Sequence, residues 1–235
     1  MIALVTGATR GIGRRIALEI ASLGYDMAIV GRDMKKLEAV KAEMEGLGRK
    51  VETICEDLAD PSSYKRVISA AAERFGGIDV LVNCAGLSLA GPFTEATPEQ
   101  WDRIFAVNAK APFFLCQEAL PFLKLSRKPV IINIASVVGF KGYPNQSVYS
   151  SSKHALTGFT KVLAKEVQPL GIRVHLISPG AVATEMVTRM RPDIDPDELI
   201  QPDEIAEIVR FILTREGSST IDQFYIRRFG SLAFD

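Results

Sequence analysis

Cysteine and histidine are scarce in this sequence, which contains three cysteines and two histidines among 235 residues. Cys55, Cys84 and Cys116 are far apart, odd in number and without a Cys-x-x-Cys pair. This pattern argues against a disulfide framework and against a zinc site. Since His154 and His175 are also too few to hold a metal with them, we expect no bound metal ion.

The sequence also lacks an excess of either charge and any long apolar run. Lysine and arginine together number 28, as do aspartate and glutamate, so no net field attracts nucleic acid or an anionic membrane. No run of about 18 apolar residues could span a bilayer. The first residues, MIALVTGATRGIG, have neither the basic start nor the longer apolar core of a signal peptide. We therefore expect a cytoplasmic protein that binds neither nucleic acid nor membrane.

What the sequence does contain is a regular alternation of short apolar runs and longer amphipathic segments. Several short runs are apolar at consecutive positions, which is typical of strands covered on both faces. The alternation predicts an α/β, doubly wound Rossmann fold with a parallel seven-stranded sheet and helices on both faces. Because no repeat or linker interrupts it, residues 1–235 are expected to form a single domain. The expected strands are 2–7, 26–31, 51–57, 78–86, 130–136, 172–180 and 221–228, and the expected helices lie within 10–24, 34–47, 62–77, 98–125, 149–167 and 203–213.

Three glycines stand between the first expected strand and the first expected helix. Gly7, Gly11 and Gly13 occur in the stretch TGATRGIG. Glycine at such a position allows a tight turn and lets the backbone approach a pyrophosphate at the positive N-terminus of the helix. The spacing G-x-x-x-G-x-G differs from the commoner dinucleotide motif G-x-G-x-x-G. An ordinary glycine-rich turn is the alternative interpretation.

A second motif, YSSSK, places Tyr149 and Lys153 four residues apart. On a helix these two residues share one face. A phenol with its ordinary pKa near 10 is a poor general base at neutral pH, but a nearby ammonium stabilises the phenolate. We therefore expect Lys153 to lower the pKa of Tyr149, which could then exchange a proton with a carbonyl or alcohol oxygen. Composition alone would produce such a pair in roughly one sequence in four, so the assignment depends on the surrounding motifs.

Together these motifs resemble those of the short-chain dehydrogenase/reductase superfamily, in the same order and along almost the whole chain. TGATRGIG is similar to the family's glycine motif, NCAG at 83–86 to its NNAG, and the Pro179-Gly180 pair to the one after its sixth strand. The resemblance implies an enzyme that transfers a hydride between a nicotinamide and a small carbonyl/alcohol substrate. The family's catalytic tetrad is matched by Asn108, Ser136, Tyr149 and Lys153.

The resemblance also implies a role for each member of that tetrad. Tyr149 would be the general acid or base, its pKa lowered by Lys153 and by the positive nicotinamide of the oxidised cofactor. Ser136 would hydrogen-bond and orient the substrate oxygen. Lys153 would hold the nicotinamide ribose, and Asn108 would support a water that connects Lys153 to solvent. Together with Ser136 and Tyr149, Val138 is expected to contact the substrate. No chemistry is expected from nearby polar residues: Cys84, Ser150, Ser151, Ser152 and His154.

The expected cofactor is NADP(H). An NAD site ordinarily uses an acidic side chain at the end of the second strand, but this strand ends in Gly31. Arg32 and Arg10 are expected to converge on the adenosine 2′ position, where two guanidinium groups suit a phosphate. Asp33 follows, and we interpret it as the N-cap of the helix 34–47. The full expected cofactor site comprises Gly7, Thr9, Arg10, Gly11, Ile12, Gly13, Arg32, Asp57, Leu58, Asn83, Ala85, Gly86, Tyr149, Lys153, Pro179, Gly180, Val182 and Thr184.

The sequence does not name the substrate. In the family, specificity resides in the loop after the sixth strand, here about 184–202 and short, and in the chain end, where the frequent VDGG ending is absent. These departures favour the shorter carbonyl reductases and hydroxy-acid or serine-type dehydrogenases. The alternatives are a 3-oxoacyl-(acyl-carrier-protein) reductase and, from another class, a non-catalytic NADP(H)-binding sensor, against which the intact tetrad argues. The expected substrate-pocket side chains are Leu87, Val138, Phe140, Tyr143 and Met186.

The resemblance further implies a homotetramer or homodimer. The expected helices 98–125 and 149–168 carry more apolar residues than one sheet face needs. We expect these two helices to join the subunits, most economically into a homotetramer.

Overall fold

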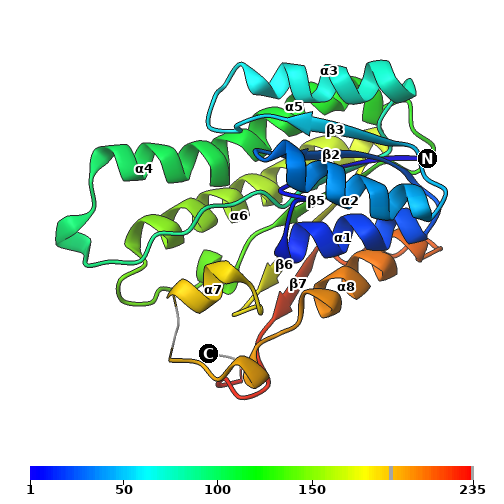
Figure 1. The fold of residues 1–235 in the computed structure, drawn as a ribbon. Coiled ribbons are helices and arrows are strands. Elements are labelled where there is room, and N and C mark those ends of the chain that lie inside the picture. Colours follow the sequence, from blue (N-terminus) through cyan, green and yellow to red (C-terminus); the bar gives the residue numbers. More distant parts are fainter. Residues whose placement is uncertain (191–192, 234–235) are drawn as a thin grey trace.

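The computed structural model describes residues 1–190 and 193–233, and a parallel β-sheet forms its centre (Figure 1). The sheet has seven strands in the spatial order β3-β2-β1-β4-β5-β6-β7. All neighbouring strands run parallel, which confirms the predicted fold class. The strands are β1 (Ile2–Thr6), β2 (Asp26–Gly31), β3 (Val51–Cys55), β4 (Val80–Asn83), β5 (Val130–Ile134), β6 (Arg173–Pro179) and β7 (Gln223–Ile226).

The order of the strands reverses between β1 and β4. The chain builds β1, β2 and β3 outward in one direction, then returns across the sheet to β4 and continues the other way. In open parallel sheets, such a reversal leaves a crevice beyond the carboxyl ends of the strands where ligands bind. The topology therefore places the candidate site at the ends of β1 and β4.

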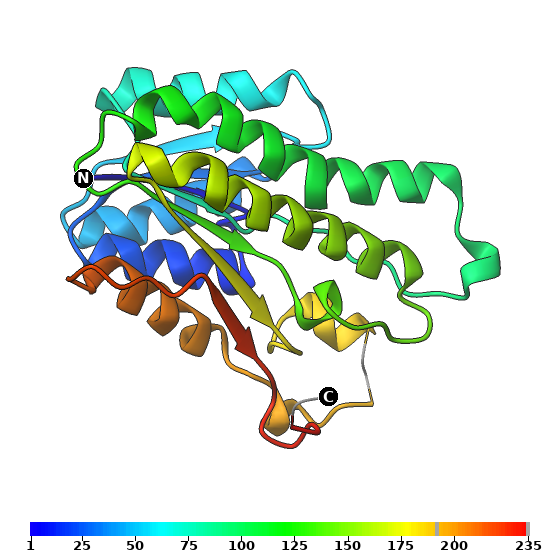
Figure 2. The same ribbon diagram turned by 180° about the vertical axis from the view of Figure 1, so that it is seen from behind.

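Helices cover both faces of the sheet (Figures 1 and 2). Successive residues of β1 show why: Ala3 and Val5 pack in the core under one layer of helices, while Leu4 packs under the other. Burial on both faces explains the nearly continuous apolar runs of the strands. One layer consists of α1 (Gly11–Ser22), α2 (Met34–Gly46) and α8 (Pro202–Thr214), and the other of α3 (Ser63–Phe75), α5 (Ala111–Leu123) and α6 (Ser147–Val167).

Local sequence signals account for several helix ends. Gly24 has φ +95° just after α1, a conformation that glycine adopts without strain. The Asp33 side chain accepts a hydrogen bond of 3.2 Å from Lys36 N, so it is the N-cap of α2, as predicted. The helix α6 begins at Ser147, two residues before the expected start.

The expected helix 98–125 has an internal irregularity. Helix α4 (Pro98–Phe105) begins with a capping box formed by Thr97 and Gln100. A π-helical turn, η2 (Ala106–Lys110), then joins it to α5. Such a turn accommodates an extra residue within a helix and is frequent at functional sites.

The loop expected at about 184–202 contains two short helical elements. Helix α7 (Glu185–Met190) follows β6, and the 3₁₀ turn η5 (Pro196–Glu198) precedes α8. Arg191 and Pro192 lie outside the described residues. No helix within the described ranges is both long enough and apolar enough to cross a lipid bilayer.

His175 on β6 provides a test of how this core responds to acid. Its ring is buried, with Nδ1 2.7 Å from the carbonyl oxygen of Ile221, while Nε2 has no hydrogen-bond partner. Burial lowers the pKa of His175, so the unfolded chain binds a proton that the folded chain does not. This contribution to stability is present above the ordinary histidine pKa of about 6.5 and is lost as the pH falls below it.

We therefore expect the free energy of unfolding to decrease between about pH 7.5 and about pH 5.5, measured by urea denaturation. His175→Asn should weaken this pH dependence. His154 has an exposed side chain, so His154→Asn is the matched control and should retain the wild-type slope. An unchanged slope in His175→Asn would contradict the assignment.

Candidate functional site

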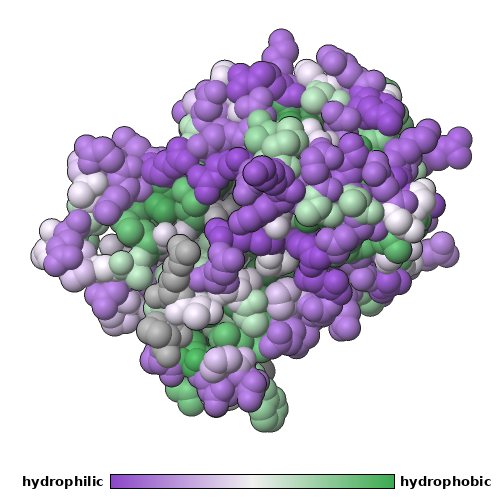
Figure 3. Space-filling model, viewed as in Figure 1, coloured by the Kyte–Doolittle hydropathy of each residue, from purple (hydrophilic) through white to green (hydrophobic). Residues whose placement is uncertain are grey.

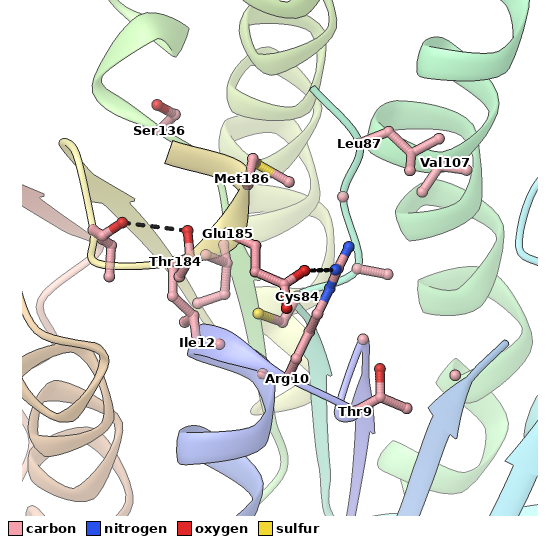
Figure 4. Close-up of a pocket in the computed structure, with 18 of the residues that line it drawn as sticks. Thr9, Arg10, Ile12, Cys84, Leu87, Val107, Ser136, Thr184, Glu185 and Met186 are labelled. Atoms are coloured by element: carbon pink, nitrogen blue, oxygen red, sulfur yellow. Dashed lines mark hydrogen bonds and ion pairs between the residues drawn. The ribbon is translucent and has the colours of Figure 1, made fainter. Parts of the chain in front are cut away.

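A cavity of about 430 Å³ lies at the carboxyl ends of the strands. Its walls come from the glycine turn after β1, from the ends of β2, β4, β5 and β6, and from the beginning of α7 (Figure 4). Except for Asn83, every residue predicted to hold the cofactor lines this cavity. On the face seen in Figure 3, apolar residues gather between α4 and α7 within a mostly hydrophilic surface.

The glycine turn forms a backbone cradle without room for side chains. Gly7 has φ +70°, and a Cβ built on it would lie 2.8 Å from Ala85 Cα. A Cβ on Gly13 would lie 2.3 Å from the carbonyl oxygen of Gly7. Helix α1 begins here without a side-chain cap at Arg10, so its first N–H groups can bind an anion. The turn therefore fits the pyrophosphate of a dinucleotide.

The end of β2 has no space for the acidic side chain of an NAD site. A Cβ on Gly31 would lie 2.5 Å from Thr9 Cγ2. Arg32 follows Gly31 and lines the cavity beside the glycine turn. A bound dinucleotide would therefore meet a cationic rather than an anionic side chain at the end of β2.

Arg10 and Arg32 both line the cavity, and their convergence on a 2′-phosphate stays a prediction. In this structure the Arg10 guanidinium forms an ion pair with the carboxylate of Glu185, across the mouth of the cavity (Figure 4). Both side chains are more than half exposed, at 54% and 61%. Glu185 lies at the start of α7, and no pattern in the sequence indicates that its carboxylate lies next to Arg10.

Asp57 follows β3 at the opposite end of the cavity from the catalytic groups. Its carboxylate accepts hydrogen bonds from Arg103 Nη2 at 2.7 Å and from Ala59 N at 3.0 Å. Although burial acts to raise the pKa of Asp57, these hydrogen bonds hold it below its ordinary value. Asp57 is thus an ionised acceptor, held by a residue of α4.

Three of the four predicted catalytic residues lie together at the other end. Lys153 is 4% exposed, and its Nζ donates a hydrogen bond of 3.0 Å to the carbonyl oxygen of Ile134. The same Nζ is 5.9 Å from the centre of the Tyr149 ring. Ser136 Oγ donates to the carbonyl oxygen of Pro179 at 3.4 Å and is close enough to Tyr149 to affect the pKa of the phenol. Ser136, Tyr149 and Lys153 all line the cavity.

The expected lowering of the Tyr149 pKa is wrong for the protein alone. Burial raises the pKa of Tyr149 to about 12, against a smaller lowering by the hydrogen bond with Ser136. Burial also lowers the pKa of Lys153 to about 8, because the interior disfavours each charged form. Lys153 is not among the groups that lower the pKa of Tyr149 in the protein alone. Tyr149 is therefore a protonated acid at neutral pH.

Asn108 does not line the cavity but supports its wall. Located in the π-helical turn, its Oδ1 accepts from Leu87 N and its Nδ2 donates to Leu87 O, both at 2.8 Å. Nδ2 also donates to Ser152 Oγ at 3.0 Å, and Ser152 Oγ donates to the carbonyl oxygen of Tyr149 at 2.7 Å. Asn108 thus ties the segment after β4 to the catalytic helix α6. We assigned no role to Ser152, whose only sequence signal was its position one turn after Tyr149.

Two residues predicted to contact ligands, Asn83 and Phe140, do not line the described cavities. The Asn83 side chain is buried and donates to Asn133 Oδ1 at 2.9 Å. Asn133 in turn donates to Thr160 Oγ1 at 2.9 Å, so these side chains join β4, β5 and α6. Phe140 does not line either described cavity; its ring packs against Tyr225 at 5.9 Å between centroids.

Cys84 lines the cavity (Figure 4), in agreement with its place in the NCAG motif. Burial raises the pKa of its thiol to about 12, so no reactive thiolate forms near neutral pH. Among the residues that the structure describes, no group of three or more histidine, cysteine, aspartate or glutamate side chains could hold a metal ion.

A smaller lobe of about 120 Å³ adjoins the catalytic end. Ser136 and Tyr149 line both cavities. The predicted residues Val138 and Tyr143 line this lobe, Met186 lines both cavities, and Leu87 lines the main one. The basic residues Lys141, Arg227 and Arg228 also line the lobe and were not predicted, although two adjacent arginines at the end of an expected strand are a visible signal.

The parallel sheet, the glycine cradle and the adjacent serine, tyrosine and lysine define a dinucleotide-binding oxidoreductase of the Rossmann type. The family model described as short chain dehydrogenase matches residues 1–195. The chain belongs to this family, as the sequence motifs predicted, and is an oxidoreductase of the kind that acts on CH–OH and C=O groups.

Similar proteins include 3-oxoacyl-(acyl-carrier-protein) reductases. The one from Staphylococcus aureus is 36% identical over 200 residues, which cover 85% of this chain and 81% of the relative. The one from Thermotoga maritima is 32% identical, and the match covers 94% of this chain and 94% of the relative.

Among solved structures, a metagenomic short-chain oxidoreductase in complex with NADP is 33% identical, with a TM-score of 0.85 and 97% of each chain covered. An alcohol dehydrogenase from Thermococcus sibiricus complexed with 5-hydroxy-NADP is 28% identical, with a TM-score of 0.90, covering 99% of this chain and 98% of that chain.

The glycine cradle yields a prediction about side-chain size. In Gly13→Ala, the added methyl group meets backbone that cannot move away, so we expect a loss of about 1–3 kcal/mol in the free energy of unfolding and weaker dinucleotide binding. Denaturation and calorimetric titration with NADPH measure the two effects. Gly46→Ala, where a Cβ meets nothing within 4 Å, is the matched control. Wild-type affinity in Gly13→Ala would contradict the assigned role of the turn.

Proposed function

We propose that this protein is an NADP(H)-dependent oxidoreductase that interconverts a small carbonyl compound and its alcohol. The observation that carries the proposal is that Ser136, Tyr149 and Lys153 line the same cavity as the glycine cradle. A nicotinamide nucleotide whose pyrophosphate lies on the cradle would extend along this cavity toward the three side chains.

The protonated state of Tyr149 defines its part in the reaction. When bound, the nucleotide supplies the hydride. The Ser136 hydroxyl hydrogen-bonds the substrate oxygen, and the Tyr149 phenol donates its proton to that oxygen as negative charge develops there. The Lys153 ammonium would favour the resulting phenolate, and Lys153 is the residue that would hold the nicotinamide ribose. Because burial raises the pKa of Tyr149 to about 12 in the protein alone, the phenol holds a proton at neutral pH that it can donate in carbonyl reduction.

The preference for NADP(H) rests on charge and space near the adenosine. Thr9 fills the space that a side chain at position 31 would need, so no carboxylate there opposes a 2′-phosphate. Arg32 lines the cavity, and Arg10 can exchange the carboxylate of Glu185 for a phosphate. The NADP and 5-hydroxy-NADP in two similar structures support the same choice.

A second candidate function is the reduction of 3-oxoacyl thioesters on an acyl carrier protein. The names of the relatives from Staphylococcus aureus and Thermotoga maritima favour it. Turnover of an acetoacetyl thioester in preference to free carbonyl compounds would select this function.

We further propose a cytoplasmic homotetramer, with helices α4, α5 and α6 at the subunit contacts. Large apolar side chains on these helices are exposed, with Trp101 at 43%, Phe113 at 45% and Val162 at 54%. Burying such a surface against a second copy would stabilise the assembly. A monomeric mass in light scattering would exclude this part of the proposal.

The central test is Tyr149→Phe, which removes the proton donor and keeps the ring. We expect the rate of NADPH consumption to fall by about 10²–10⁴-fold. A panel of simple ketones and aldehydes, 2- and 3-oxo acids and an acetoacetyl thioester covers the substrate classes. NADPH binding, followed by calorimetry, should persist in the variant. Equal turnover by wild type and variant would exclude the proposed mechanism.

The lowered pKa of Lys153 predicts the alkaline limit of the reaction. Lys153 is charged below its pKa of about 8 and neutral above it. We therefore expect kcat/KM for carbonyl reduction to be level below that pH and to decline above it. In Lys153→Arg, the side chain stays charged, and the decline should move to higher pH. A wild-type profile that remains level to about pH 10, where Lys153 is neutral, would contradict this role.

A further inference from the structure

The substrate lobe has an uneven distribution of charge. Among its described lining residues are the basic side chains of Lys141, Arg227 and Arg228, but no aspartate or glutamate. Arg227 and Arg228 come from the segment directly after β7, which curves back beneath α7 at the catalytic end of the sheet (Figure 2). This segment lies beyond residue 195, where the match to the family model ends.

Arg227 is held in place by neutral groups alone. Its Nη1 donates to the carbonyl oxygens of Arg228, Phe229 and Ser231 at 3.0, 2.9 and 2.8 Å. Within the described part of the chain, it forms no ion pair with a carboxylate. The side chain is therefore fixed in position and partly buried, and no described carboxylate pairs with its charge.

Arg228 differs from its neighbour in this respect. Its Nη1 is 2.6 Å from Glu198 Oε2, and the Arg228 side chain is 17% exposed. Glu198 thus neutralises Arg228, while the charge of Arg227 remains available to a ligand. A partly buried cation without a counterion is costly, and a bound carboxylate would offset that cost with charge-assisted hydrogen bonds.

We infer that the substrate is a short oxo acid or hydroxy acid whose carboxylate binds Arg227 while its carbonyl or hydroxyl oxygen contacts Ser136 and Tyr149. This inference rests on the proposed function and names its substrate class. Arg227, Ser136 and Tyr149 all line one lobe of about 120 Å³, which suits a short chain between the two oxygen-bearing ends. The planar guanidinium can meet a carboxylate with two parallel hydrogen bonds.

The experiment compares acids with their neutral methyl esters. With NADPH, wild type should reduce 3-oxobutanoate with a higher kcat/KM than methyl 3-oxobutanoate, by about tenfold or more. In Arg227→Gln, this acid-to-ester ratio should fall by about tenfold or more, to about one, since the charge-assisted contact is lost. Arg227→Lys should retain part of the preference, because it keeps the charge and loses the planar fork.

Two further variants test whether the acid-to-ester ratio depends on charges at the lobe or on the overall charge of the protein. Glu198→Gln removes the counterion of Arg228 and should raise the acid-to-ester ratio. Arg74→Gln removes one positive charge from α3, where Arg74 pairs with Glu52 at 3.6 Å, and should leave the ratio unchanged. A ratio that falls equally in Arg74→Gln and Arg227→Gln would overturn the inference.

Binding measurements keep the inference independent of turnover. Calorimetric titration with 3-hydroxybutanoate and with its methyl ester, in the presence of NADPH, should show tighter binding of the acid, lost in Arg227→Gln. If wild type reduces neutral carbonyls through Tyr149 but does not prefer acids, the inference is wrong and the proposed function stands. If no carbonyl is reduced but the acid binds through Arg227, the proposed function fails and the anion site stands. Equal binding of acid and ester overturns the anion site.

Discussion

The hydrogen bond from the buried ammonium of Lys153 to the carbonyl of Ile134, at 3.0 Å, is the contact on which the reaction centre depends. It joins α6 to the end of β5, and a buried cation requires such an acceptor. Tyr149 lies one turn earlier on α6, and Ser136 lies two residues after Ile134, so the bond brings the two hydroxyls together. Gly139 permits this packing, since a Cβ there would lie 2.5 Å from Thr157 Oγ1.

The parts of the fold and site that could be predicted from the sequence depend on local patterns. Consecutive apolar residues indicated covered parallel strands, and Asp33 and Gly24 marked helix ends through contacts with their own neighbours in the chain. The glycine turn and the Tyr149–Lys153 pair were recognisable because each requires a fixed spacing within one turn. The order of the motifs along the chain then indicated the family.

What could not be predicted depends on partners distant in the sequence. Arg10 pairs with Glu185, which lies 175 residues further along. Asn83 and Asn133 find each other across neighbouring strands, and nothing in the spacing of NCAG indicates which way its asparagine points. The pKa of Tyr149 follows from how deeply the folded chain buries the phenol, and no count of nearby charges gives that depth.

The π-helical turn at Ala106–Lys110 has a consequence for how this region can change. Each residue of an α-helix rotates the next by about 100°, so the turn sets the angular phase between α4 and α5. Deleting one residue there would rotate Trp101 and its exposed neighbours relative to the buried face of α5, and would withdraw Asn108 from Leu87. Length in this stretch is therefore constrained more tightly than composition. Homologous chains should tolerate substitutions here far more readily than insertions or deletions.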